Sequence, residues 1–185
     1  MYYDRTVDRS KLRLGVSACL LGNEVRYDGG HKRNPLLTDL LGPFVEWVPV
    51  CPEVEAGFGT PREPMRLVTD HGTVRLVTVQ TQIDVTTQLQ RVVDKRLREL
   101  PSLGLDGFVL KKGSPSCGLF GERGLFAAAL AAAEPQLPLE EEGRLDDPPL
   151  RDVFFARVFA YRAHRGIENR ALERAVGRLL SLRRF

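Results

Sequence analysis

The chain has 185 residues, the length of one ordinary domain, and a chain this long buries about 70% of its unfolded surface without disulfide or metal support. Its composition, 43% hydrophobic and 28% charged, is that of a globular protein, and the net charge of +3 is too small to indicate nucleic-acid binding. All apolar runs fall short of the ~18 residues of a membrane span, and residues 1–11 lack the apolar core of a signal peptide. We therefore expect one cytoplasmic domain over residues 1–185, with residues 1–11 as a polar N-terminal extension.

Apolar runs bounded by loops predict strands and helices in alternation. Three such runs are typical of strands: KLRLGVSA (11–18), FVEWVPV (44–50) and DGFVLKK (106–112). The first is expected to be buried on both faces, and the third is of the parallel type. The dipeptide HG between MRLVTD and TVRLVTV indicates a β-hairpin. The predicted helices cover residues 34–42 with Asn34 as a cap, 84–100 with Asp84 as N-cap, 124–134, 146–166 and 171–184. QLPLEEEG (136–143) indicates a further short strand, whose EEEG end we interpret as a solvated turn.

This order predicts an α/β fold with a mainly parallel, Rossmann-like sheet, helices on both faces, a β-hairpin insertion and C-terminal helices over about 148–185. Ligands of such sheets bind beyond the carboxyl ends of the strands. Cys19, Cys51 and Cys117 stand at these ends or a few residues beyond them. If the three strands are neighbours, the three sulfurs converge at one edge of the sheet.

The spacing of the three cysteines contains no CxxC and no Cys/His pair at zinc-finger distance, so spacing alone indicates a metal only weakly. Small buried core residues are an alternative interpretation. However, the cysteines lie among glycine, serine and proline, and backbone N–H groups in such loops favour an anionic sulfur. Three thiolates leave a metal one ligand short. They suit either a zinc ion with an open position or a [4Fe–4S] cluster with one open iron, and composition does not choose between them.

Several neighbours of the cysteines could carry chemistry. Glu53 and Glu55 follow Cys51 and could move a proton beside a bound substrate, or could be solvated loop charges. Ser114 and Ser116 precede Cys117 and could donate hydrogen bonds to substrate or cluster, or could serve the turn alone.

Two residues of the loop after the first strand are further candidates. Arg26, in VRYDGG, could bind an anionic or planar ligand, or could pair with Asp28. His31 is the candidate partner if one cysteine belongs to a Cys–His catalytic dyad. The basic C-terminal segment 170–185 has helical spacing and is interpreted as a solvated helix face.

Three longer stretches carry a family resemblance. VSACLLGNEVRYDGGHKR, VPVCPEVEAGFGTPREPMRLV and LKKGSPSCG, in this order, resemble the DUF523 family, which includes the thiouracil desulfurases. The resemblance covers roughly the first two-thirds of the chain. It implies a [4Fe–4S] cluster held by Cys19, Cys51 and Cys117, with one open iron that binds the sulfur of a thiolated nucleobase. It also implies that water replaces this sulfur without net redox change, with Glu53 and Ser114 as the catalytic residues.

Arg26 and Ser116 are the candidate substrate-binding residues. The expected partner is a small thiolated molecule such as thiouracil, with no nucleic-acid polymer and no membrane, and both a monomer and a dimer stay open. Two alternatives also stay open. A non-catalytic iron–sulfur sensor or sulfur carrier would bind a cluster without turning over thiouracil. A zinc-thiolate hydrolase would use the same three thiolates for a zinc ion.

Overall fold

Four parallel strands form the central sheet of the computed structural model, which describes residues 10–181, in the order β2–β1–β5–β6. The strands are β1 (Leu12–Ser17), β2 (Val45–Val50), β5 (Gly107–Leu110) and β6 (Leu139–Glu141). Val16 of β1 is paired with Pro49 of β2 on one side and with Val109 of β5 on the other. The three strands predicted to precede the cysteines are therefore neighbours, and their carboxyl ends share one edge of the sheet.

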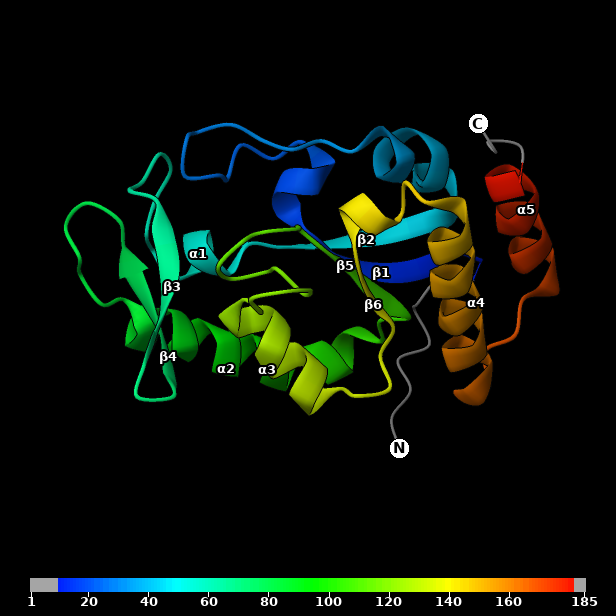
Figure 1. Ribbon diagram of the computed structural model, residues 1–185. Coiled ribbons are helices and arrows are strands. Elements are labelled where there is room, and N and C mark those ends of the chain that lie inside the picture. The colour runs from blue at the N-terminus through cyan, green and yellow to red at the C-terminus, as the bar shows by residue number, and fades with distance from the viewer. Residues whose placement is uncertain (1–9, 182–185) are drawn as a thin grey trace.

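Helices cover both faces of this sheet (Figure 1). In chain order they are η1 (Ala18–Leu21), η2 (Leu36–Leu41), η3 (Gly42–Phe44), α1 (Pro52–Glu55), α2 (Thr86–Leu103), α3 (Leu125–Ala133), η4 (Glu142–Arg144), α4 (Pro148–His164) and α5 (Arg170–Ser181). None of the helices in the described part of the chain is long and apolar enough to cross a membrane. The predicted α/β class, with its C-terminal helices, is confirmed.

The core has two apolar clusters, one on each face, because successive side chains of a strand point to opposite faces. Phe108 of β5 packs with α2 and α3, and its ring meets Phe126 edge to face at 5.7 Å. Val109 points to the other face and packs with η2, α4 and α5. Gly15 of β1 lets the ring of Phe108 lie across the strand, since a Cβ there would stand 2.2 Å from the ring. Burial on both faces explains why β5, with the sequence GFVL, is a continuous apolar run. In β1, LRLGVS, the apolar residues alternate with Arg, Gly and Ser and belong to the second cluster.

The predicted hairpin is confirmed as a separate two-stranded antiparallel sheet of β3 (Met65–Asp70) and β4 (Thr73–Thr78). Its two turn residues, His71 and Gly72, both have positive φ, at 46° and 80°. A two-residue turn with this backbone matches the twist of the flanking strands. The hairpin is inserted between α1 and α2, beside the carboxyl edge of the main sheet (Figure 1).

Two details differ from prediction. The EEEG segment is not a solvated turn, because Glu140 and Glu141 are 5% and 2% exposed and belong to β6. Glu141 is buried since its Oε1 accepts the backbone N–H groups of Leu119 at 2.7 Å and Phe120 at 3.2 Å, beyond Cys117. The helix predicted over 84–100 runs over Thr86–Leu103, so that Asp84 lies one residue before its N-cap, although its carboxylate still accepts the Thr86 N–H at 2.9 Å. Residues 1–9 of the predicted extension, and 182–184 of the last predicted helix, lie outside the described residues.

Candidate active site

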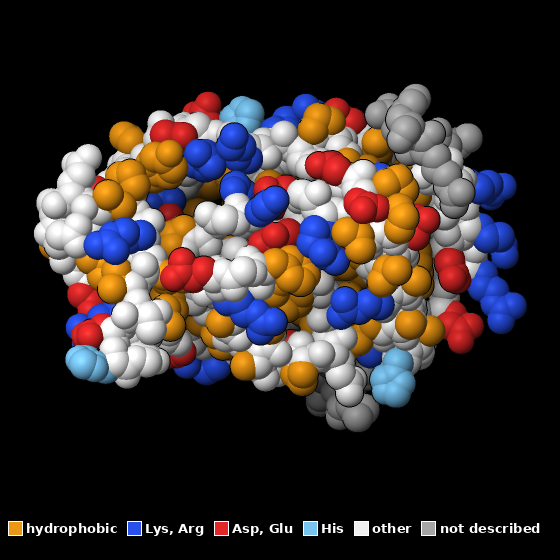
Figure 2. All heavy atoms as spheres, in the orientation of Figure 1, with side chains coloured by type: hydrophobic (Ala, Val, Ile, Leu, Met, Phe, Trp, Pro, Cys, Tyr) orange, Lys and Arg blue, Asp and Glu red, His pale blue; other side chains and the backbone are white. Residues whose placement is uncertain are grey.

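A cavity of about 240 Å³ lies at the carboxyl edge of the sheet. Its lining includes Cys19, Cys51 and Cys117, the polar residues Glu53 and Ser114, and the basic residues Arg26, Arg62 and Lys111. The space-filling view shows a hollow on this side of the molecule with Lys and Arg side chains gathered beside it (Figure 2). The predicted convergence of the three cysteines is thus observed, and basic groups accompany them.

Each cysteine is placed by a different local structure. Cys19 lies in η1 directly after β1, Cys51 is the N-cap residue of α1 directly after β2, and Cys117 lies within the loop between β5 and α3. Cys19 and Cys117 are buried, Cys51 is half-buried, and all three are free of disulfides. Their side chains therefore reach the cavity from three neighbouring strands.

The thiols share an environment that disfavours charge when no cation is present. Burial, followed by the nearby Cys51 thiol, raises the pKa of Cys19 to about 11. Burial likewise raises the pKa of Cys51 and of Cys117, and the other two thiols also raise the pKa of Cys117. Metal ligation requires thiolates, so a cation bound here would have to displace the protons.

The loop that carries Cys117 is a tight turn built by Ser114. Its Oγ accepts the backbone N–H groups of Ser116 at 3.2 Å and Cys117 at 3.1 Å, and its carbonyl accepts the N–H of Gly118 at 2.8 Å. The turn function predicted as an alternative for Ser114 is therefore present. The hydroxyl hydrogen remains available as a donor, and Ser114 lines the cavity.

The close approach of Gly124 to the Cys117 loop gives a testable prediction. A Cβ at Gly124 would lie 2.4 Å from the carbonyl carbon of Ser116 and 2.7 Å from the nitrogen of Cys117, so alanine must push this backbone away. We expect Gly124→Ala to lower the iron retained per chain after anaerobic preparation, measured against wild type. Gly177→Ala, a helical position with nothing within 4 Å of the new Cβ, is the control. Equal iron in both variants would show that iron binding does not depend on the position of the Cys117 loop against Gly124.

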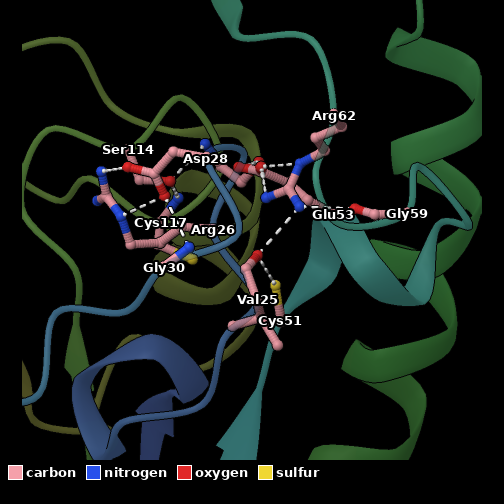
Figure 3. A network of polar contacts seen from close by, with 11 residues as sticks. Val25, Arg26, Asp28, Gly30, Cys51, Glu53, Gly59, Arg62, Ser114 and Cys117 are labelled. Carbon is pink, nitrogen blue, oxygen red and sulfur yellow. Dashed lines mark hydrogen bonds and ion pairs between the residues drawn. The ribbon is translucent and has the colours of Figure 1, made fainter.

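Glu53 stands at the cavity in the first turn of α1 and is held from two sides (Figure 3). Ser116 Oγ donates to its Oε1 at 2.9 Å, and Arg62 Nε donates to its Oε2 at 3.0 Å. Ser116 has no exposed surface, so the structure places it behind Glu53 rather than where the predicted substrate contact would need it. The segment from Cys51 to Met65 thus brings the Glu53 carboxylate against the turn that holds Cys117.

Glu55 faces away from these groups. Its Oε1 accepts the backbone N–H of Cys51 at 3.2 Å, and its Oε2 pairs with Arg96 of α2 at 2.5 Å. Glu55 is therefore a capping and helix-packing residue of α1. Of the two acidic candidates, Glu53 lines the cavity and Glu55 does not.

Arg26 lines the cavity but is paired within its own loop, which is the alternative predicted for it. Its Nε and a terminal nitrogen donate to the two carboxylate oxygens of Asp28 at 3.2 and 2.9 Å. The hydrogen bond from Arg26 lowers the pKa of Asp28 to about 2, so the pair stays ionised at neutral pH. His31 is exposed and accepts the N–H of Arg33 at 3.1 Å, and it does not line the cavity.

Sequence reasoning missed two basic residues of the site, Arg62 and Lys111. Arg62 lies in GFGTPREP, a Gly/Pro-rich loop, and a charged residue inside such a loop was the available signal. Lys111 directly follows β5, and its backbone N–H donates to Ser17 Oγ at 3.0 Å, which joins the ends of β5 and β1.

Comparison with known proteins identifies the family. The matching family model is described as 2-thiouracil desulfurase and covers residues 14–142. A curated relative, "Uncharacterized protein YbbK" of Bacillus subtilis (strain 168), is 35% identical over 109 residues, or 56% of this chain and 71% of YbbK. The solved structure of the [4Fe-4S]-dependent thiouracil desulfidase TudS (DUF523Vcz) matches with a TM-score of 0.59 and 30% identity, over 79% of this chain and 99% of TudS. The resemblance carried by the three motifs is confirmed, and the chain belongs to the 2-thiouracil desulfurase family.

Proposed function

We propose that this protein is a [4Fe–4S]-dependent desulfidase that removes sulfur from a thiolated nucleobase such as thiouracil. The observation that carries the proposal is the convergence of Cys19, Cys51 and Cys117, from three neighbouring strands, on one cavity that Glu53 also lines. We place the reaction in the cytoplasm, where thiols stay reduced.

The donor set fits an iron–sulfur cluster. Thiolates are soft ligands that select zinc or iron–sulfur sites over magnesium and calcium. Within residues 10–181, no group of three or more His, Cys, Asp or Glu side chains is arranged to hold a single metal ion. Three thiols around one cavity suit a cluster in which each thiolate binds its own iron. A cluster held by Cys19, Cys51 and Cys117 supplies an iron with an open position, a Lewis acid with affinity for sulfur.

The reaction exchanges the thiocarbonyl sulfur of the substrate for the oxygen of water. A carbon–oxygen bond forms, the carbon–sulfur bond breaks and hydrosulfide leaves, so no electrons are gained or lost. Glu53 takes a proton from the attacking water through its carboxylate, which lies at the cavity wall. Ser114 donates its free hydroxyl hydrogen to the oxygen that develops on the ring.

Two further residues have supporting assignments. Arg26, fixed by Asp28 at the cavity wall, is assigned to the binding of the planar substrate. Ser116 orients Glu53 by its hydrogen bond to Oε1, and we assign it to Glu53 rather than to the substrate.

The test begins with protein purified without oxygen. Iron, acid-labile sulfide and the visible spectrum are measured first, and about four iron and four sulfide per chain with brown absorption are expected. Thiouracil is then added, and uracil and hydrosulfide are quantified. A cluster without any release of hydrosulfide would support the sensor or sulfur-carrier alternative. A colourless protein loaded with zinc would overturn the proposal in favour of the zinc-thiolate hydrolase.

A further inference from the structure

The Arg62 side chain is buried beside Glu53, the candidate base, and donates its hydrogen bonds to other groups of the protein. Its side chain is 6% exposed and that of Glu53 is 12% exposed. Four hydrogen bonds are formed: Nε and one terminal nitrogen donate to Glu53 Oε2, and the other terminal nitrogen donates to the carbonyls of Val25 at 3.0 Å and Gly59 at 2.9 Å. This guanidinium is therefore committed to fixed protein acceptors, although it lines the cavity (Figure 3).

The pattern of donors makes the two oxygens of Glu53 unequal. A carboxylate has about four lone-pair positions, two on each oxygen. Oε2 accepts two hydrogen bonds from Arg62, and Oε1 accepts one from Ser116 Oγ at 2.9 Å. Oε1 is thus the oxygen with an acceptor position left for a proton from outside the pair.

Arg62 also braces the wall of the cavity, through both its side chain and its backbone. The Val25 carbonyl that accepts from Arg62 lies 3.8 Å from Cys51 Sγ, and the backbone N–H of Arg62 donates to the carbonyl of Tyr27 at 2.8 Å. Val25 and Tyr27 both line the cavity. Arg62 is therefore the point where the loop after β1, helix α1 and the loop before β3 are joined.

We propose that Arg62 is the positioning residue of Glu53, which fixes the carboxylate against Ser116 and leaves Oε1 as the proton-accepting oxygen. This inference rests on the proposed function of Glu53 as the base. Two N–H groups of the rigid, planar guanidinium hold one carboxylate oxygen, Oε2, and neither a lysine nor a neutral amide offers two donors in that arrangement. The expected consequence of its loss is a misplaced base rather than a lost substrate contact.

The kinetic test compares Arg62→Gln and Arg62→Lys with wild type, all prepared without oxygen. We expect Arg62→Gln to lower kcat about a hundredfold, the effect of a misplaced catalytic group, while KM and iron per chain stay near the wild-type values. Arg62→Lys keeps the positive charge but not the pair of N–H groups, so its kcat is expected to lie between those of wild type and Arg62→Gln. The matched control is Arg96→Gln, which breaks the ion pair to Glu55, the other glutamate of helix α1. Its kcat is expected to be near that of wild type.

A double variant shows whether Arg62 acts through Glu53. In a Glu53→Gln background the base is already absent, so adding Arg62→Gln is expected to change the remaining rate by less than about threefold. A further large loss in this background would overturn the positioning function, and so would an undiminished kcat in Arg62→Gln alone. Loss of the iron in Arg62→Gln would also overturn it, because Arg62 would then serve the cluster loop rather than the base.

A crystal structure of Arg62→Gln gives a readout that does not depend on turnover. We expect the Glu53 carboxylate to leave Ser116 in this variant and to keep that contact in Arg96→Gln. An unmoved Glu53 overturns the inference. Failure of the proposed function is recognised separately, as wild-type protein that binds no cluster or releases no hydrosulfide from thiouracil, and the crystallographic comparison still decides the position of Glu53 in that case.

Discussion

Replacing any one of Cys19, Cys51 and Cys117 with alanine is expected to remove the cluster and with it all release of hydrosulfide from thiouracil. The three thiols that line the cavity are soft ligands, and each loss leaves only two thiolates. Alanine is preferred to serine because a serine oxygen could still bind iron. Iron and acid-labile sulfide per chain, measured after anaerobic reconstitution, are expected to fall from about four to near zero.

The fold should survive each of these substitutions. Removing one buried sulfur atom is expected to cost on the order of 1 kcal/mol of the free energy of unfolding, which urea titration of the cluster-free proteins measures. Circular dichroism of the variants should match the wild type without cluster. A variant that keeps its full iron and sulfide would show that the replaced cysteine is no ligand. A variant that folds, lacks iron and still releases hydrosulfide would refute the cluster mechanism as a whole.

Much of the fold follows from local sequence signals. Strand β5 is buried on both faces, and its sequence, GFVL, is a continuous apolar run rather than an alternating one. His71 and Gly72 adopt the positive φ values of a tight hairpin turn, which the HG dipeptide indicated. The strand order was beyond such signals, because it depends on which apolar faces pack together in three dimensions.

In the candidate site, too, some features could be predicted from the sequence and others could not. The convergence of the cysteines was predictable only on the condition that the three strands are neighbours, because the carboxyl ends of neighbouring parallel strands meet at one edge of the sheet. The observed order β2–β1–β5 meets this condition. The burial of Glu141 was not, because a run of glutamates is ordinarily solvated and only the distant N–H groups of Leu119 and Phe120 make its burial favourable. Arg62 escaped notice for a related reason: its importance lies in partners that only the folded loops bring together.

Replacing Glu53 with glutamine is expected to leave the cluster in place and to lower the rate of thiouracil desulfuration by a factor on the order of a hundred. Glutamine has the size of glutamate and keeps an oxygen that can accept from Arg62, but an amide cannot take a proton from water. Iron and sulfide per chain should equal the wild-type values, because Glu53 is not among the proposed ligands. The measurement is single-turnover release of hydrosulfide by protein of matched iron content.

Glu55→Gln is the matched control for this prediction. Glu55 lies on the same short helix and is also an ion-paired carboxylate, yet it contacts the Cys51 N–H and Arg96 instead of the cavity. Its glutamine variant keeps an oxygen for that N–H, so its rate is expected to stay within a few fold of wild type. If Glu53→Gln were fully active, Glu53 would have no part in the proton transfer. If both variants lost activity equally, the effect would belong to the helix that positions Cys51 rather than to one carboxylate. Only a loss confined to Glu53, with the cluster intact, assigns the base to the carboxylate that Arg62 and Ser116 hold at the cavity.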